Sequence, residues 1–337
     1  MAPGPLSVGI KNKESFTMKN LFAKSLKTIM LPVIVYGVFL CICFERFSNW
    51  NCVYTIFMQT IIPTITAYAV AYGNICGIFD FTIGARVIIS GVTGGLLAAN
   101  YGIPGMILGA FAASLITAAI TGYLNRILRI PSLVLTMGLT MIFEIAGRQF
   151  AGRFGFVQID NAYAVLGSSP CIILLFFASA ALFYFICNNT QFSYHMRAVG
   201  SNETVAKNNG IKADLVKFKS FIYGSIFIAL ASVLTLSQSG SVGAQTGLGS
   251  VTIVFKPLIS ILLALVLQSI CDLTIGIFIS QFSLNIIFIG LIAAGMPDTF
   301  QNVVLGAFLL IVMIFFRNTE KIDGWRIKRA VLRGQKQ

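Results

Sequence analysis

The chain has 337 residues, of which 57% are hydrophobic and only 10% are charged. A soluble globular domain carries about 25% charged residues, so this composition excludes an ordinary water-soluble protein. The net charge of +13 would suit a nucleic-acid-binding protein, but the Lys and Arg residues concentrate in segments outside the apolar runs. That distribution is typical of the cytoplasmic loops of membrane proteins, and we expect the lipid bilayer and no nucleic acid as a partner.

Apolar runs recur along the chain, and a helix of roughly 20 residues crosses the hydrocarbon core of a membrane. The first run follows a polar tail, so we expect a retained helix and not a cleaved signal peptide. The sequence predicts an all-α, polytopic bundle of about ten transmembrane helices. The expected spans are residues 28–44, 53–72, 81–99, 103–124, 131–149, 170–187, 218–236, 253–271, 273–293 and 302–316.

Three basic segments set the expected orientation, because Lys and Arg are retained on the cytoplasmic side during insertion. They are an N-terminal tail (1–27), a polar insert (188–217) and a C-terminal tail (317–337). Six spans separate the first from the second and four separate the second from the third, so all three lie on one side. We expect a transmembrane domain over 28–316, with both termini and the polar insert in the cytoplasm.

A short internal echo indicates a possible repeat. Residues 80–84 read DFTIG and residues 272–276 read DLTIG, an offset of 192. Both stretches lie at the cytoplasmic start of an expected span, and six crossings separate them. Related halves of this kind occur in transporters that are built from internal repeats.

Ionisable residues at membrane depth are rare and are candidates for function. The clearest are Asp80, Arg86, Glu144 and Asp272. Arg86 lies six residues after Asp80, too far for an i,i+4 pair on one helix. The two aspartates can cap helix starts by accepting backbone N–H groups, or they can form the relay of an ion-coupled carrier. Both interpretations remain open at this point.

We expect no catalytic residue, no metal site and no cofactor site in this chain. His195 is the single histidine and has no Cys, Asp or Glu neighbours at metal-ligand spacing. A phosphate-binding GxxxxGK[ST] loop does not occur in the sequence.

Polar uncharged side chains within the spans are candidate contacts for a neutral, hydroxyl-rich solute, since hydroxyl and amide groups form directional hydrogen bonds. They can also bond neighbouring helices. Together with the two DxTxG stretches, the candidate pathway residues are Gln59, Thr64, Asn74, Asp80, Thr82, Gly84, Asp272, Thr274, Gln281 and Asn285.

The polar insert contains a predicted short helix over residues 202–209, NETVAKNN. Ser201 or Asn202 provides the N-cap, and Gly210 provides the left-handed stop. Small residues such as Ala206 would leave a low surface that fits a groove. We interpret the helix as a plug for a socket on a partner protein, because it lacks the bulky apolar face that would rest on lipid.

At these residues the chain resembles the sugar-type ABC importer permeases, the family of the ribose, xylose, galactoside and autoinducer-2 permeases. RAVGSNETVAKNNGI (197–211) is similar to the family's cytoplasmic coupling segment. CGIFDFTIG (76–84) and LRIPSLVLTMG (128–138) are similar to two further family motifs. The resemblance covers about residues 53–316. The positions that match the coupling segment and carry its role by resemblance are Arg197, Gly200, Asn202, Glu203, Ala206, Gly210 and Ile211.

The resemblance implies a permease subunit in a bacterial plasma membrane. It pairs with a second permease, identical or different, binds a cytoplasmic ATPase that carries ATP and magnesium, and receives solute from an extracytoplasmic binding protein. The expected cargo is a monosaccharide or related neutral polar solute, with pentoses, hexoses, autoinducer-type furanoses and nucleosides open. The alternatives are a stand-alone ion-coupled carrier that uses Asp80 or Asp272, and a structural membrane protein.

Overall fold

The computed structural model describes residues 18–128, 130–268 and 271–297, with a few isolated positions between 300 and 310. The described part is almost entirely helical. Its long helices are α1 (Met18–Ile42), α3 (Trp50–Ile75), α4 (Thr82–Leu128), α5 (Ser132–Phe150), α6 (Cys171–Asn189), α9 (Ala213–Ser239), α10 (Thr252–Leu267) and α11 (Leu273–Ala293). Its short elements are α2 (Phe44–Phe47), η1 (Gly152–Phe154), β1 (Phe156–Gln158), η2 (Asn161–Gly167), α7 (Gln191–Ser201), α8 (Glu203–Asn208), β2 (Ser241–Gly243) and η3 (Gly249–Val251).

Within these described ranges, seven helices are long and apolar enough to cross a membrane, and Ile29–Ile42 is a shorter apolar helix. The all-α, multi-pass prediction is therefore confirmed, whereas the count of ten spans is not. The expected span 302–316 and the C-terminal tail lie outside the described ranges, apart from isolated positions, and so does the N-terminal tail up to residue 17.

Helix α4 accounts for two expected spans at once. It consists of two helices that meet at a kink at Gly102, where φ is 63° and ψ is −150°. The two halves pack closely: a Cβ at Gly109 would lie 2.9 Å from the carbonyl oxygen of Thr93, and a Cβ at Gly94 would lie 2.9 Å from that of Met106. Only glycine permits such an approach of two backbones, so the halves form a helical hairpin.

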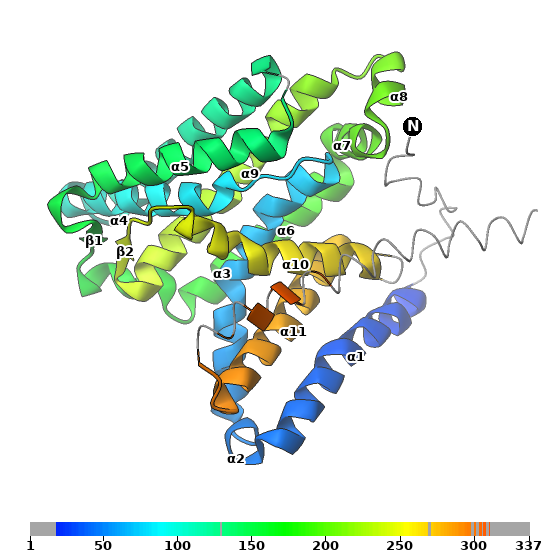
Figure 1. Cartoon of the computed structure of the whole chain (residues 1–337). Coiled ribbons are helices and arrows are strands. Elements are labelled where there is room, and N and C mark those ends of the chain that lie inside the picture. The colour runs from blue at the N-terminus through cyan, green and yellow to red at the C-terminus, as the bar shows by residue number, and fades with distance from the viewer. Residues whose placement is uncertain are drawn as a thin grey trace, which may run out of the picture. The chain divides into compact units, whose positions relative to one another are not determined.

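The chain divides into two compact units, one formed by Tyr54–Leu258 and the other by the described residues before Tyr54 and after Leu258. In the first unit, α9 packs along α4, and α5 covers α4 as well (Figure 1). Helix α9 also approaches α3, since a Cβ at Gly224 would lie 3.4 Å from the carbonyl oxygen of Ala69. Helix α9 is therefore the central helix of this unit.

One end of the first unit is closed by a small antiparallel pair of strands, β1 and β2, in which Val157 is opposite Val242. Both valines are buried in an apolar cluster with residues of α4 and α9. Beside it, the buried Glu144 of α5 accepts hydrogen bonds from the Leu248 amide (2.9 Å), the Ser250 amide (2.9 Å) and the Ser250 hydroxyl (2.6 Å). Glu144 thus anchors the segment that leads into α10.

In the second unit, α1 packs against α11. The start of α11 repeats the local geometry of the start of α4: Asp272 accepts a hydrogen bond from the Thr274 amide at 2.9 Å, as Asp80 does from Thr82 at 2.9 Å. Like the first half of α4, α11 is followed by a glycine with positive φ, Gly295 at 83°. These parallels support the predicted internal repeat, and they show that both aspartates cap helix starts.

Candidate functional site

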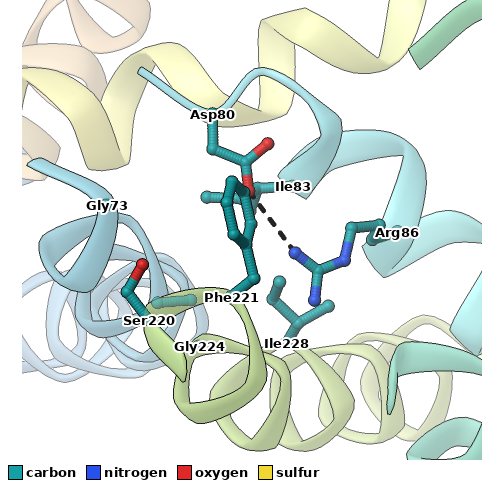
Figure 2. A pocket seen from close by; sticks show the side chains of 9 residues that line it. Gly73, Asp80, Ile83, Arg86, Ser220, Phe221, Gly224 and Ile228 are labelled. Carbon is teal, nitrogen blue, oxygen red and sulfur yellow. Dashed lines mark hydrogen bonds and ion pairs between the residues drawn. The ribbon is translucent and has the colours of Figure 1, made fainter. Parts of the chain in front are cut away.

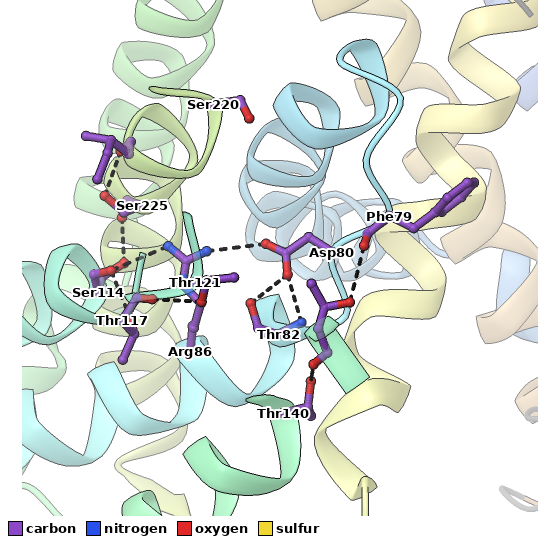
Figure 3. Close-up of polar contacts among 12 residues, drawn as sticks. Phe79, Asp80, Thr82, Arg86, Ser114, Thr117, Thr121, Thr140, Ser220 and Ser225 are labelled. Carbon is purple, nitrogen blue, oxygen red and sulfur yellow. Dashed lines mark hydrogen bonds and ion pairs between the residues drawn. The ribbon is translucent and has the colours of Figure 1, made fainter. Parts of the chain in front are cut away.

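A buried ion pair lies where α3 passes into α4 (Figure 3). Asp80 Oδ1 accepts hydrogen bonds from the Thr82 amide (2.9 Å) and hydroxyl (2.6 Å). Its Oδ2 lies 3.4 Å from Arg86 Nη1, and the two side chains are 6% and 1% exposed. This contact does not require i,i+4 spacing, because Asp80 lies ahead of the helix that carries Arg86.

Arg86 links three segments of the first unit. Its Nη2 donates a hydrogen bond to the carbonyl oxygen of Ser114, in the second half of α4, at 3.4 Å. The Ser114 hydroxyl in turn donates to the carbonyl oxygen of Ser225 in α9 at 2.8 Å. Among the residues that the structure describes, Arg86 Nε has no hydrogen-bond partner. The guanidinium therefore uses only part of its five donors.

A small pocket opens beside this pair (Figure 2). Its wall is shared by the α3–α4 junction and by the first turns of α9, which contribute Ser220, Phe221 and Gly224. The cavity volume is about 10 Å³, which is about what a single water molecule needs, so in this conformation it is not a sugar site. The lining residues are Ala69, Gly73, Asp80, Ile83, Arg86, Ser220, Phe221, Gly224 and Ile228.

The polar insert is well structured. Its second helix, α8, begins at an N-cap, where Asn202 Oδ1 accepts a hydrogen bond from the Val205 amide at 3.1 Å. It ends at Gly210, which has a φ of 80°. The Ile211 amide donates to the carbonyl oxygen of Ala206 (3.0 Å) and the Gly210 amide to that of Lys207 (3.0 Å). These two bonds form a Schellman motif, so the prediction of a short helix with caps at both ends is confirmed.

Glu203 fastens α8 to α9. Its carboxylate lies 2.8 Å from the ammonium of Lys207 and 2.7 Å from that of Lys217. Partial burial acts to raise the pKa of the Glu203 carboxyl, but hydrogen bonds from the two lysines outweigh it, and the pKa lies below its ordinary value. Glu203 is therefore an ion that already has partners within the chain.

An aromatic cluster fastens α7 to the same framework. Phe192 of α7 stacks near Tyr223 of α9 with ring centroids 4.5 Å apart, and Tyr72 of α3 lies 6.2 Å from Tyr223. Because aromatic pairs are worth about 0.5–1.5 kcal/mol beyond their buried area, the cluster holds α7 firmly. Its members are Tyr68, Tyr72, Phe183, Phe192, Tyr223 and Phe227.

Most of the residues that match the coupling motif have structural roles inside the insert. Arg197 donates to the carbonyl oxygen of Cys187 at the end of α6 (3.2 Å), and Gly200 lies in the last turn of α7. Ala206 is 3% exposed, so our expectation that it would contribute to an outer surface is wrong: it packs inward. The outer face of α8 carries other residues, of which Val205 is 53% exposed.

Six of the candidate pathway residues belong to the first unit and four to the second. On α3, Gln59 is exposed, and Thr64 and Asn74 donate hydrogen bonds to carbonyl oxygens of their own helix. A Cβ at Gly84 would overlap the carbonyl oxygen of Ser250, which shows a packing role for that glycine. Their role in a pathway stays a prediction.

In the second unit, Asp272 and Thr274 form the cap of α11, and Gln281 and Asn285 are buried one turn apart on the same helix. Gln281 is fully buried, and neither atom of its amide has a hydrogen-bond partner within the described ranges. The part played by these four residues in a pathway likewise stays a prediction.

Sequence reasoning missed the residues that tie the insert and the ion pair to α9. No motif or spacing in the sequence distinguishes these residues, which are Lys217, Ser114 and Tyr223, from others in their helices. A lysine fourteen residues after Glu203 gives no signal until the turn between α8 and α9 brings them together. The spacing of Phe192 and Tyr223 is equally uninformative without the fold.

Comparison with known proteins places the chain in a family. Residues 52–313 match the family described as the permease component of the branched-chain amino acid transport system. The chain is 26% identical over 269 residues to the autoinducer 2 import system permease protein LsrC of Yersinia pseudotuberculosis serotype O:1b (strain IP 31758), which covers 77% of this chain and 72% of that protein. It is 24% identical over 328 residues to LsrC of Enterobacter sp. (strain 638), covering 95% and 92%. No solved structure gives a significant match.

These matches agree with the motifs and with the apolar helices. They confirm the resemblance to sugar-type ABC importer permeases, and they identify a multi-pass membrane protein that serves as a transport subunit. The chain belongs to the family of the permease components of the branched-chain amino acid transport system.

Proposed function

We propose that the chain is the membrane-spanning subunit of an importer that moves a monosaccharide or related neutral polar solute into a bacterial cell. A cytoplasmic ATPase binds the polar insert and supplies the energy from ATP and magnesium. A second permease subunit completes the pathway, and an extracytoplasmic binding protein delivers the solute. Both termini and the insert face the cytoplasm.

The observation that carries this proposal is the construction of the polar insert. Helix α8 is capped at both ends and fastened to α9 by the Glu203–Lys217 ion pair at 2.7 Å, and α7 is held by the aromatic cluster. A loop that only joined two spans would need none of these contacts. A rigid projection with an outer face that includes Val205 suits a groove on a partner and can transmit force from it.

The buried charges favour a neutral cargo. In the described ranges the buried charged side chains include those of Asp80, Arg86 and Glu144. Arg86 is paired with Asp80, and Glu144 accepts three hydrogen bonds from Leu248 and Ser250. An anion would require cationic side chains directed toward it, whereas hydroxyl groups are bound by amides such as that of Gln281. The LsrC relatives are named as permeases of an autoinducer 2 import system, which supports a small solute of this class.

The ion-coupled alternative gains no support from the geometry. A proton relay needs acids that can exchange protons along a path. Asp80 and Asp272 both serve as helix caps, and Asp80 is also paired with Arg86.

Reconstitution tests the proposal. The chain is inserted into liposomes with its ATPase, its second permease and its binding protein, and the uptake of radiolabelled pentoses, hexoses and furanoses is measured. We expect uptake that requires ATP and persists when ionophores abolish ion gradients. Uptake by the chain alone, driven by a proton or sodium gradient, would show instead that the chain is a stand-alone ion-coupled carrier.

A further inference from the structure

Helix α9 carries both the anchor of the polar insert and part of the support of the buried ion pair. Lys217 holds Glu203 of α8 at 2.7 Å. Eight residues later, or about 12 Å along the helix, the carbonyl oxygen of Ser225 accepts the hydrogen bond of Ser114, which in turn accepts from Arg86. A displacement of α8 therefore acts on the same helix that supports Arg86.

A second connection runs through α3. The aromatic cluster joins Phe192 of α7 to Tyr72, one turn before α3 ends. From there the chain passes through Gly77, where φ is 73°, to Asp80. The two ends of the ion pair are thus connected to the insert by different helices, Asp80 through α3 and Arg86 through α9.

The ion pair itself is incompletely bonded. The Asp80–Arg86 distance of 3.4 Å is a single contact and not the bidentate arrangement that arginine and a carboxylate favour. Arg86 Nε lacks a partner among the described residues although the side chain is 1% exposed. Burial makes unused donors costly, and the present arrangement already leaves one donor of Arg86 unused. A modest displacement of either helix can therefore exchange one incomplete set of partners for another at little net cost.

We propose that Arg86 is a positioning residue of the transport cycle. Motion of the polar insert, delivered through α9 and α3, changes the hydrogen-bonding partners of the Asp80–Arg86 pair and thereby moves the α3–α4 junction. The inference rests on the proposed function, since it requires an ATPase that moves the insert. It assigns to the pair the link between ATP hydrolysis and solute movement.

The test uses the complete importer in liposomes and measures two rates, ATP hydrolysis and solute import. The main variant is Asp80→Asn with Arg86→Gln, which removes both charges together and leaves no lone buried ion. We expect the complex to assemble and hydrolyse ATP, while the number of solute molecules imported per ATP falls at least tenfold. Thr140→Val is the matched control, because Thr140 is buried near the pair but its hydroxyl donates only to the carbonyl oxygen of Thr136 in its own helix.

An unchanged import-to-hydrolysis ratio in the double variant overturns the inference, and so does a parallel fall of both rates, which is the result of simple structural damage. If the double variant does not reach the membrane, Arg86→Lys decides: it keeps the charge but cannot reach Asp80 and Ser114 together, so its ratio should also fall. An unaltered chain that recovers no ATPase at all overturns the proposed function, and the inference with it.

Discussion

The carboxylate of Glu203 and the ammonium of Lys217 lie 2.7 Å apart, which joins the first residue of α8 to the second turn of α9. The same carboxylate holds Lys207 at 2.8 Å. One acidic side chain thus forms ion pairs with a lysine of each helix, and these contacts fix the position of α8 relative to α9.

Replacing Lys217 by Met should loosen α8 without unfolding the protein. A partly exposed ion pair contributes about 0.5–1 kcal/mol, so amide hydrogen exchange over residues 203–211 should accelerate about two- to fivefold. Lys219→Met is the control, because Lys219 is exposed and forms no ion pair among the described residues. Equal exchange in the two variants would show that the ion pair does not hold the helix.

The pH dependence of this contact follows from the lowered pKa of Glu203. A carboxyl group with a lowered pKa in the folded state stabilises that state above its ordinary range and loses the contribution as the pH falls through the folded value. Exchange in residues 203–211, corrected for intrinsic rates, should therefore be constant above about pH 5 and rise only below about pH 4. Glu203→Gln should show no such rise, and a transition near neutral pH in the unaltered chain would contradict the assignment.

Gly210 should tolerate Asn better than Ala. A Cβ there would meet nothing within 4 Å, so the only obstacle is the φ of 80°. A left-handed conformation costs a residue such as Ala about 1–2 kcal/mol, whereas Asn adopts it more readily. Gly138→Ala is the control, since Gly138 also has open space but lies inside helix α5. Thermal melting in detergent should rank Gly210→Ala below both Gly210→Asn and Gly138→Ala.

How far the sequence predicts this molecule depends on how local the determinants are. The caps of α8 at Asn202 and Gly210, and the caps at Asp80 and Asp272, follow from a few neighbouring residues and are confirmed. The ion pair of Asp80 with Arg86 was not predicted, because helical spacing does not apply to a residue ahead of the helix.

The longer-range features needed the fold. The expected spans 81–99 and 103–124 are correct as apolar runs, and Gly102 lies between them as the kink. Their packing into a hairpin could not be predicted, since glycines such as Gly94 and Gly109 do not reveal which backbone approaches them. The inward position of Ala206 was likewise fixed by contacts that a short sequence window cannot contain.

Gly84 is predicted to be intolerant of any side chain. A Cβ there would overlap the backbone oxygen of Ser250, which cannot rotate away. Gly84→Ala should lower the free energy of unfolding by about 1–3 kcal/mol, as overpacking does. Gly147→Ala is the control, because its Cβ would make ordinary contact with Ile89 at 3.7 Å. Equal melting temperatures for the two variants would show that the α4–Ser250 contact is not as close as described.

Gln281→Leu tests whether the buried amide of Gln281 binds the solute or has no ligand. If the buried amide binds the solute, this change to an apolar side chain of similar size should raise the KM for import at least about fivefold, because a lost hydrogen bond in a site costs about 1–3 kcal/mol. If the amide has no ligand, removing two unbonded polar atoms should raise the melting temperature and leave import unchanged. The neighbouring Ser280→Ala, also buried and without a partner in the described ranges, reports how general the effect is.

The central claim is that the polar insert binds the ATPase, and quantitative co-purification from native membranes tests it most directly. Val205→Arg places a charge on the outer face of α8, where the side chain is 53% exposed, and Val165→Arg does the same at an equally exposed valine of η2. We predict that an ATPase co-purifies with the unaltered chain and with the Val165 variant, and that less than a tenth of it remains with the Val205 variant. Recovery of the chain without an ATPase, or of as much ATPase with Val205→Arg as with the unaltered chain, would contradict the account.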